Sequence, residues 1–147
     1  MAAVAQERPF PCHVKIDTGM GRYGFLPGDT AAIAQVYRTE GLQVQGIYTH
    51  FYSAYDNEQA TRAQFAAYQG VLDFLQKEGI APGLRHCCNS SAFLKYPEMY
   101  CDAVRLGSAL LGRIAVPNRL GLKRVGYAEA DVEEIRWLPA GRPRWPL

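Results

Sequence analysis

The chain has 147 residues, a formal net charge of +2 and a hydrophobic fraction of 48%, which together predict one globular domain with a buried core. Its lysines and arginines are scattered, so the charge pattern does not indicate nucleic-acid binding. Residues 1–9 hold no apolar signal segment, and no apolar run approaches the roughly 18 residues that a membrane span needs. We therefore expect a cytoplasmic protein that binds neither nucleic acid nor membrane.

The cysteine pattern gives no sign of a metal site. Cys12, Cys87, Cys88 and Cys101 include no C-x-x-C pair, which is the usual basis of a zinc site. Cys87 and Cys88 are adjacent and would point to opposite faces of a strand. We expect reduced thiols that fill small spaces in the core.

The first predicted element after a short lead-in, residues 1–11, is a strand over Cys12–Thr18. Val14 and Ile16 lie on one face of it, because side chains alternate along a strand. The other face carries the polar set His13, Lys15 and Asp17. A glycine-containing turn follows this strand, and it delivers Arg22 just past the strand end.

Strand and helix patterns alternate along the next part of the chain. A first helix is expected from Asp29, as its N-cap, to a stop at Gly41. A longer helix is expected to begin at Asp56, where Gln59 completes a capping box, and to end at Gly79. The remaining expected elements are strands at 44–51, 84–88 and 103–106, a short helix at 90–95, and later strands at 121–127 and 131–138.

Four alternations of strand and helix predict an α/β fold of parallel β/α units. Right-handed crossovers would place the carboxyl ends of all these strands on one rim of the sheet. In β/α barrels that rim carries the chemistry. Residues at the predicted strand ends are therefore the candidates for a functional site.

Four segments at these strand ends resemble, in order and spacing, motifs of the alanine racemase family. They are His13–Phe25 (HVKIDTGMGRYGF), Tyr48–Phe51 (YTHF), His86–Ser90 (HCCNS) and Asp102–Gly107 (DAVRLG). Members of that family depend on pyridoxal phosphate (PLP) and belong to fold type III. The resemblance extends over about 12–138.

The resemblance implies a partial (β/α)8 TIM-type barrel of about four β/α units. Residues 12–120 would form this part of the barrel, and residues 121–147 would begin the family's second, β-rich domain. The family's PLP-bearing lysine lies on its first barrel strand and its catalytic tyrosine in the second domain. None of Lys15, Lys77, Lys95 and Lys123 matches that lysine motif, so we carry over neither role and expect a fragment that pairs as a homodimer or with a complementary barrel half.

The resemblance also implies roles for single residues. Catalytic roles fall to Arg22, His50 and Arg105. Contacts to PLP fall to His50, His86, Asn89, Ser90, Arg105, Gly107 and Ser108. Contacts to the amino-acid substrate fall to Arg22 and Met20. Arg105 would face the pyridine nitrogen of PLP and, being always protonated, would leave that nitrogen unprotonated.

Local alternatives stay open for several of these residues. Arg105 could form a salt bridge with Asp102, and Asn89–Ser90 is also an ordinary helix N-cap. Lys15 matches a lysine that is carbamylated in several members of the family, but pairing with Asp17 is the simpler arrangement.

At the level of function, the resemblance implies PLP-dependent interconversion of L- and D-alanine, which supplies D-alanine for peptidoglycan. Two alternatives are a half-barrel that binds PLP or phosphate without catalysis, and an inactive truncated gene product.

Overall fold

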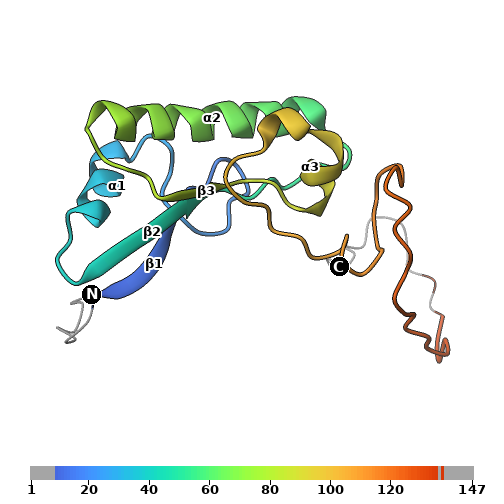
Figure 1. Ribbon diagram of the computed structural model, residues 1–147. Helices are drawn as coiled ribbons and strands as arrows, with labels where there is room; N and C mark the ends of the chain where they lie inside the picture. The colour runs from blue at the N-terminus through green and yellow to red at the C-terminus, as the bar shows by residue number, and fades with distance from the viewer. Residues whose placement is uncertain (1–8, 136, 138–147) are drawn as a thin grey trace.

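The computed structural model describes residues 9–135 and 137, and its body is a three-stranded parallel sheet with helices on one face (Figure 1). The strands are β1 (Phe10–Lys15), β2 (Leu42–Tyr48) and β3 (Leu84–His86), in the order β1-β2-β3. The helices are α1 (Thr30–Tyr37), α2 (Glu58–Lys77) and α3 (Ser90–Lys95), and a 3-10 turn, Pro97–Met99, follows α3. The predicted parallel α/β architecture is confirmed, and the span of α3 is as predicted.

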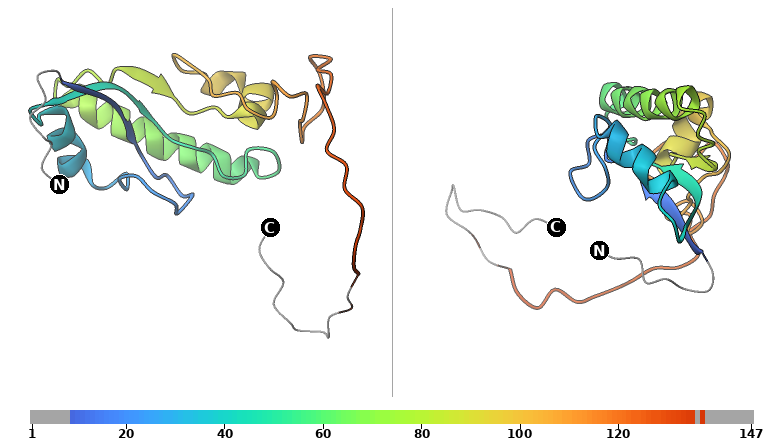
Figure 2. Two further views of the ribbon diagram at one scale, coloured as in Figure 1. Left: turned by 90° about the horizontal axis from the view of Figure 1, so that it is seen from below. Right: turned by 90° about the vertical axis from the view of Figure 1, so that its left-hand side faces the viewer.

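Helices α1 and α2 cover the apolar face of the sheet (Figures 1 and 2). Val14 and Ile47 on the strands, Ile33 on α1 and Leu75 on α2 are all buried in one core. Tyr68 of α2 is fully buried there too, and its hydroxyl donates a 2.8 Å hydrogen bond to the Ile47 carbonyl. Burying side chains of this size supplies most of the free energy that holds the helices to the sheet.

The opposite face of the sheet carries a polar and aromatic row. In the register of the parallel strands, Lys15 lies beside Tyr48, and Tyr48 lies beside His86. Two residues before Lys15 on β1, His13 lies beside Gly46 of β2. The alternation seen in the sequence therefore places His13 and Lys15 on the face that α1 and α2 leave uncovered.

Strands β1 and β2 begin and end earlier than expected. Ile16 N still donates to Tyr48 O of β2, and Ile16 also forms an isolated parallel bridge with Phe25, in which Asp17 N donates to Phe25 O and Phe25 N donates to Lys15 O, at 2.8 and 2.9 Å. The turn after β1 thus folds back and forms hydrogen bonds with the end of the strand, where it borders the polar face.

The expected fourth strand, 103–106, does not form. Asp102 N and Ala103 N both donate to Arg85 O, so the pairing slips by one residue and leaves a single bridge between His86 and Ala103. Beyond it, Arg105 N still donates to Cys88 O at 3.0 Å. The segment consequently runs beside β3 without becoming a regular strand.

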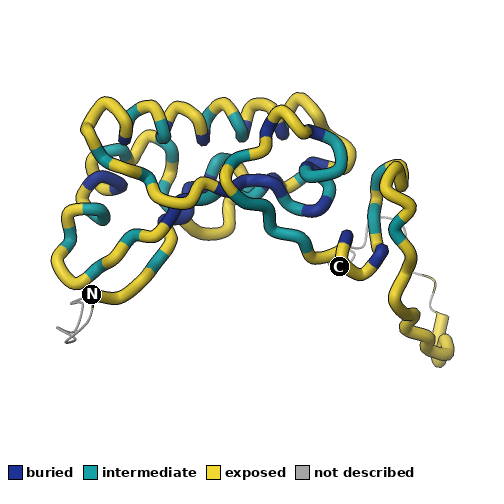
Figure 3. Tube along the Cα trace, viewed as in Figure 1, coloured by how far each residue is buried: buried dark blue, intermediate teal, exposed yellow. Residues whose placement is uncertain are grey.

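The strands expected after residue 120 are also wrong for the described residues. Residues 121–135 contain no strand, and Figure 3 shows this stretch as exposed along almost all its length. Val125 and Tyr127 are 71% and 80% exposed, and no described strand lies beside them to complete a ladder. The end of the predicted strand 131–138 lies outside the described residues.

Two predicted helix starts differ in their capping chemistry. The Asp29 carboxylate accepts from Leu26 N, three residues upstream, and makes no cap bond to α1. Asn57, not Asp56, caps α2, and its side chain accepts from Ala60 N at 2.9 Å. Both changes reflect the competition of Asp and Asn side chains for nearby backbone amides in turns. Within the described part of the chain, no helix is both long and apolar enough to cross a membrane.

Gly46 offers a test of how closely the polar face is packed. A Cβ at this position would lie 2.6 Å from His13 Cε1 and would also meet the Leu84 carbonyl oxygen. We expect Gly46→Ala to lower the free energy of unfolding by roughly 1–3 kcal/mol, because a rigid carbonyl and a held imidazole must move. Urea denaturation followed by circular dichroism measures this change.

The matched control is Gly70→Ala in α2, where a Cβ meets nothing within 4 Å. That substitution should stabilise by about 0.5–1 kcal/mol, since alanine is the better helix former. Equal effects at the two glycines would contradict the close approach at Gly46.

Candidate functional site

The guanidinium of Arg105 is the centre of the polar face. Its Nη1 donates to His86 Nδ1 at 2.7 Å and to the His86 carbonyl at 3.1 Å. Its Nη2 donates to the Thr49 carbonyl at 2.7 Å, with His50 Nδ1 and the Cys87 carbonyl at 3.3 and 3.4 Å. The strand ends of β2 and β3 therefore hold this cation entirely with neutral acceptors.

The alternative pairing of Arg105 with Asp102 is wrong. Asp102 instead forms a two-pronged salt bridge with Arg85, with Nε to Oδ2 at 2.9 Å and Nη2 to Oδ1 at 2.8 Å. This guanidinium holds the pKa of Asp102 down at about 2. Asp102 thus clamps its segment to β3, and Arg105 is left to the polar face.

His86 and His13 have fixed roles in the hydrogen bonds of this face. Because Arg105 can only donate, His86 Nδ1 must accept, and His86 Nε2 must carry the proton. His86 Nε2 lies 2.9 Å from His13 Nδ1, so it donates to His13. A chain of two donations therefore runs from Arg105 through His86 to His13.

Burial and charge keep His86 neutral. Its pKa is lowered to about 4, first by burial, then by the positive charge of Arg105 and by the electrostatic interaction with His13. The pKa of His50 is also lowered, mainly by burial and then by Arg105, Arg22 and Lys15. Both imidazoles are accordingly neutral near pH 7.

The Tyr48 ring packs against both His86 and Arg105. Its ring stacks on the His86 ring with centroids 5.0 Å apart and planes 6° from parallel. The Arg105 guanidinium carbon lies 5.0 Å from the centre of the same Tyr48 ring, within cation–π range. The aromatic faces thus add an apolar support to the hydrogen bonds that orient Arg105.

The turn that carries Met20 and Arg22 is organised by one carboxylate. Asp17 Oδ1 accepts from the backbone N–H groups of Gly19, Met20 and Gly21, and its Oδ2 accepts from that of Arg22, at 2.8–3.1 Å. These backbone donors lower the pKa of Asp17. Gly19 and Gly21 adopt φ values of 137° and 69°, which suit glycine. The arrangement places the exposed Arg22 beside the end of β1.

Lys15 does not pair with Asp17, so this alternative is wrong. Its ammonium donates to the Tyr23 carbonyl at 2.5 Å and lies 4.4 Å from the Tyr23 ring centre. The Arg22 guanidinium flanks the same ring from 5.0 Å. Lys15 is only 7% exposed, so the Tyr23 carbonyl and ring take the place of an anion.

Two buried polar residues tie the turn to the end of β2. The Thr18 and Thr49 hydroxyls are 2.6 Å apart, and Gln64 of α2 donates from Nε2 to Thr18 Oγ1 at 3.1 Å and to the His50 carbonyl at 3.2 Å. The Gln64 carbonyl accepts from Tyr52 N. Helix α2 therefore fixes the two loops that bring Arg22 and His50 to the site.

Asn89 and Ser90 begin α3 and hold the loop that follows Arg105. Asn89 Oδ1 accepts from Ala92 N, which confirms the N-cap, and its amide donates to the Phe51 carbonyl at 3.0 Å. The Ser90 hydroxyl oxygen accepts from Gly107 N at 3.0 Å and from Ala109 N at 3.2 Å. Ser90 is thus a brace beneath this loop, while Gly107 and Ser108 are exposed.

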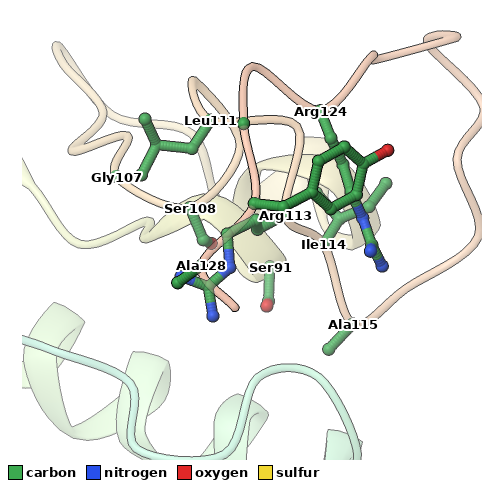
Figure 4. Close-up of a pocket in the computed structure, with 11 residues that line it drawn as sticks. Ser91, Gly107, Ser108, Leu111, Arg113, Ile114, Ala115, Arg124 and Ala128 are labelled. Carbon is green, nitrogen blue, oxygen red and sulfur yellow. The ribbon is translucent and has the colours of Figure 1, made fainter. Parts of the chain in front are cut away.

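A pocket of about 910 Å³ opens beside this loop (Figure 4). Gly107 and Ser108 form part of its wall, together with Ser91, and the arginines Arg113 and Arg124 also line it. Arg105 is not among its lining residues. The pocket therefore belongs to the Gly107–Ser108 corner and not to the cluster around Arg105.

The structure brings the predicted residues together in two groups. Lys15, Arg22, His50, His86 and Arg105 form the first, since the first two and Arg105 all act on the pKa of His50. Asn89, Ser90, Gly107 and Ser108 form the second, and Met20 contributes its N–H to the turn. Sequence reasoning missed His13, Thr49 and Gln64 as parts of the site. Only His13 had a signal, because it shares a strand face with Lys15.

Comparison with known proteins identifies the family. The family domain described as "Alanine racemase, N-terminal domain" matches residues 1–114. The alanine racemase of Desulforamulus reducens is 46% identical and covers 76% of this chain, which spans 32% of that relative. Alanine racemase 1 of Oceanobacillus iheyensis is 36% identical and covers 97% of the chain, which spans 39% of that relative.

Solved structures agree with these relatives. Alanine racemase of Clostridium difficile 630 superposes with a TM-score of 0.74 at 29% sequence identity, over 80% of this chain and 32% of that chain. The chain thus spans about a third of the length of the relatives that it matches. The matching domain and the identities above 30% show that the chain belongs to the alanine racemase family.

Proposed function

We propose that this chain supplies one wall of the PLP site of an alanine racemase that interconverts L- and D-alanine. The observation that carries the proposal is the Arg105 guanidinium, which neutral acceptors hold on an uncovered polar face at the strand ends. No carboxylate of the described residues forms a salt bridge with it. A cation held in this way is suited to a ligand that offers a hydrogen-bond acceptor.

The hydrogen-bond count of Arg105 leaves one donor for such a ligand. All five of its acceptors in the structure are bonded through Nη1 and Nη2. Nε–H bonds to none of the described residues, and the Nε atom is not buried. The pyridine nitrogen of PLP is an acceptor of the kind that this N–H can bind, so the residues present fit the cofactor.

PLP, when bound, supplies an electron-withdrawing ring that stabilises negative charge on the substrate α-carbon. Arg105 stays protonated and donates to the ring nitrogen, which tempers this withdrawal. His86 accepts from Arg105 and therefore holds the guanidinium plane in place. His50 contributes a neutral imidazole beside Arg105, because its pKa is lowered by burial.

The second group of residues would bind the phosphate of PLP. Gly107 is exposed and has open space around its Cα. The Ser108 side chain makes no hydrogen bond to any described residue. Ser90 holds this loop through Gly107 N and Ala109 N, and its own O–H is left as a donor. Asn89 ties the same corner to the end of β2.

Arg22 and Met20 would meet the amino-acid substrate. The Asp17 turn holds the backbone of both residues, and Arg22 has an exposed, planar, bidentate donor suited to a carboxylate. Lys15 lies beneath Arg22 against Tyr23, where carbamylation would turn a buried cation into an anion that can hold the Arg22 guanidinium.

We further propose the setting of this site within a larger assembly. The three-stranded sheet, covered by helices on one face, is suited to form part of a (β/α)8 barrel over residues 12–120, with a second domain starting at about residue 121. The remaining barrel strands would then cover the polar face. A cytoplasmic homodimer that supplies D-alanine to peptidoglycan is consistent with the relatives' family.

Arg105→Gln tests the cofactor site. We expect it to raise the dissociation constant of PLP, followed by quenching of tryptophan and tyrosine fluorescence, at least about tenfold, because a charged hydrogen bond contributes roughly 1.5–3 kcal/mol. The control is Arg38→Gln, which removes an exposed arginine paired with Glu78 outside the polar face. Equal affinities for the two variants would count against Arg105 as a PLP ligand.

Racemisation is tested with a chimera. In it, the part of this chain that matches the Desulforamulus reducens alanine racemase replaces the corresponding segment of that enzyme, in a bacterium that requires added D-alanine. We expect growth without D-alanine from the chimera and from its Arg38→Gln form, and none from its Arg105→Gln form. Growth that survives the loss of Arg105 would show that the proposed site does not carry the reaction.

The histidine cluster makes a prediction about pH. We expect His86 to titrate near 4 in NMR spectra of the three histidine rings, and Arg105→Gln to raise its pKa toward 6.5 by removing a neighbouring positive charge. Because the unfolded chain binds this proton more readily, His86 stabilises the fold fully above pH 6.5, and that contribution is lost as the pH falls to about 4.

Urea denaturation at pH 4.5 and pH 7 checks this dependence of stability on the protonation of His86. His86→Gln keeps an acceptor for Arg105 but does not titrate, so its stability should fall less than that of the wild type between these pH values. An equal fall in both proteins would rule out His86 as a source of the slope.

A further inference from the structure

Three cysteine sulfurs meet behind the Arg105 site, in a cluster that the proposed reaction does not use. Cys87 Sγ lies 3.8 Å from Cys101 Sγ and 4.0 Å from Cys88 Sγ. All three sulfurs converge on the carbonyl oxygen of Met99, at 3.2–3.8 Å. None of these thiols is in a disulfide.

The three thiols differ in their access to solvent. Cys87 and Cys88 are fully buried, whereas Cys101 is partly exposed. Cys101 also lies next to Asp102, whose salt bridge with Arg85 holds the segment against β3. A small oxidant can therefore reach Cys101 first, with Cys87 directly behind it.

Cys101 also has the chemical character of an attacking thiol. Contact with the Cys87 sulfur 3.8 Å away, together with the nearby Arg85 guanidinium, lowers the pKa of Cys101. The same contact and burial raise the pKa of Cys87. The cluster thus pairs an accessible thiol that ionises readily with a buried thiol that stays protonated.

We propose that Cys101 and Cys87 are a peroxide-responsive thiol pair that closes to a reversible disulfide. The Cys101 thiolate attacks one oxygen of hydrogen peroxide, so that an S–O bond forms, the O–O bond breaks, and hydroxide leaves and takes up a proton to become water. Cys87 then loses its proton and attacks the Cys101 sulfur, forming the S–S bond as the Cys101 hydroxyl leaves as water. Two thiols are oxidised and one peroxide is reduced to two waters.

The geometry favours this pair over the neighbouring one. A disulfide needs a sulfur separation of about 2.05 Å, so the 3.8 Å contact of Cys87 and Cys101 must close by roughly 1.8 Å. Cys101 lies 14 residues along the chain from Cys87 on a neighbouring segment, so closure of this pair strains no link between adjacent residues. Cys87 and Cys88 do not point to opposite faces, since both sulfurs lie against the Met99 carbonyl, but they are sequence neighbours, so their closure would have to distort the backbone between them.

Formation of the disulfide would also affect the polar face. The Cys87 carbonyl accepts from Arg105 Nη2, and the Cys88 carbonyl accepts from Arg105 N. Movement of the Cys87 side chain is therefore transmitted through one residue to the groups that hold Arg105. The thiol pair is in this way coupled to the orientation of the guanidinium.

The test uses the purified chain, treated with hydrogen peroxide, alkylated and digested with trypsin without reduction. Trypsin cuts after Arg85, Lys95 and Arg105, so Cys87 and Cys101 fall in the separate peptides 86–95 and 96–105. We expect these two peptides from one monomer to appear linked, lighter by two hydrogen atoms than their sum, and to separate on adding dithiothreitol. Fragmentation of the linked pair assigns the bond to Cys87.

Single substitutions sharpen the result. Cys101→Ala should abolish the linked peptides, and Cys88→Ala should retain them. The matched control is Cys12→Ala, a partly exposed cysteine in β1 that lies outside the cluster. A bond that maps to Cys88, or peroxide that only adds oxygen to Cys101 without a cross-link, would overturn the proposal. The wild-type map decides this even if a variant fails to fold.

Discussion

The grip of neutral acceptors on the Arg105 guanidinium is the constraint on which the rest of the site depends. A partly buried cation without a carboxylate is costly, and here carbonyls of Thr49, His86 and Cys87 offset that cost. These carbonyls come from the ends of β2 and β3, so the sheet must bring both ends to one place. The slipped pairing after β3 then delivers Arg105 to them.

Much of the fold follows from local pattern. Alternation in β1 correctly separated a core face from a polar face, and the parallel sheet follows from the repeated strand and helix segments. The residues quoted from the four motifs do gather at the strand ends, as in the contact between His86 and Arg105. Strand alternation and connection handedness are properties that short sequence segments already determine.

Other features depend on choices that a single sequence leaves open. Asp102 has Arg85 and Arg105 within reach along the chain, and only the slipped register assigns it to Arg85. Asn57 and Asp56 are both good caps, and the path of the preceding turn selects Asn57. The Thr49 carbonyl has no side-chain signature at all, and neither does the part that Gln64 plays across forty-six residues from Thr18.

The Asp17 turn has a consequence for how this part of the molecule moves. One carboxylate accepts from the amides of four successive residues, 19–22, so the four hydrogen bonds share a single acceptor group. Rotation of the Asp17 side chain would break all four together. We therefore expect the four amide protons of the loop that carries Arg22 to exchange with solvent at similar rates, because loss of one side-chain contact frees them all.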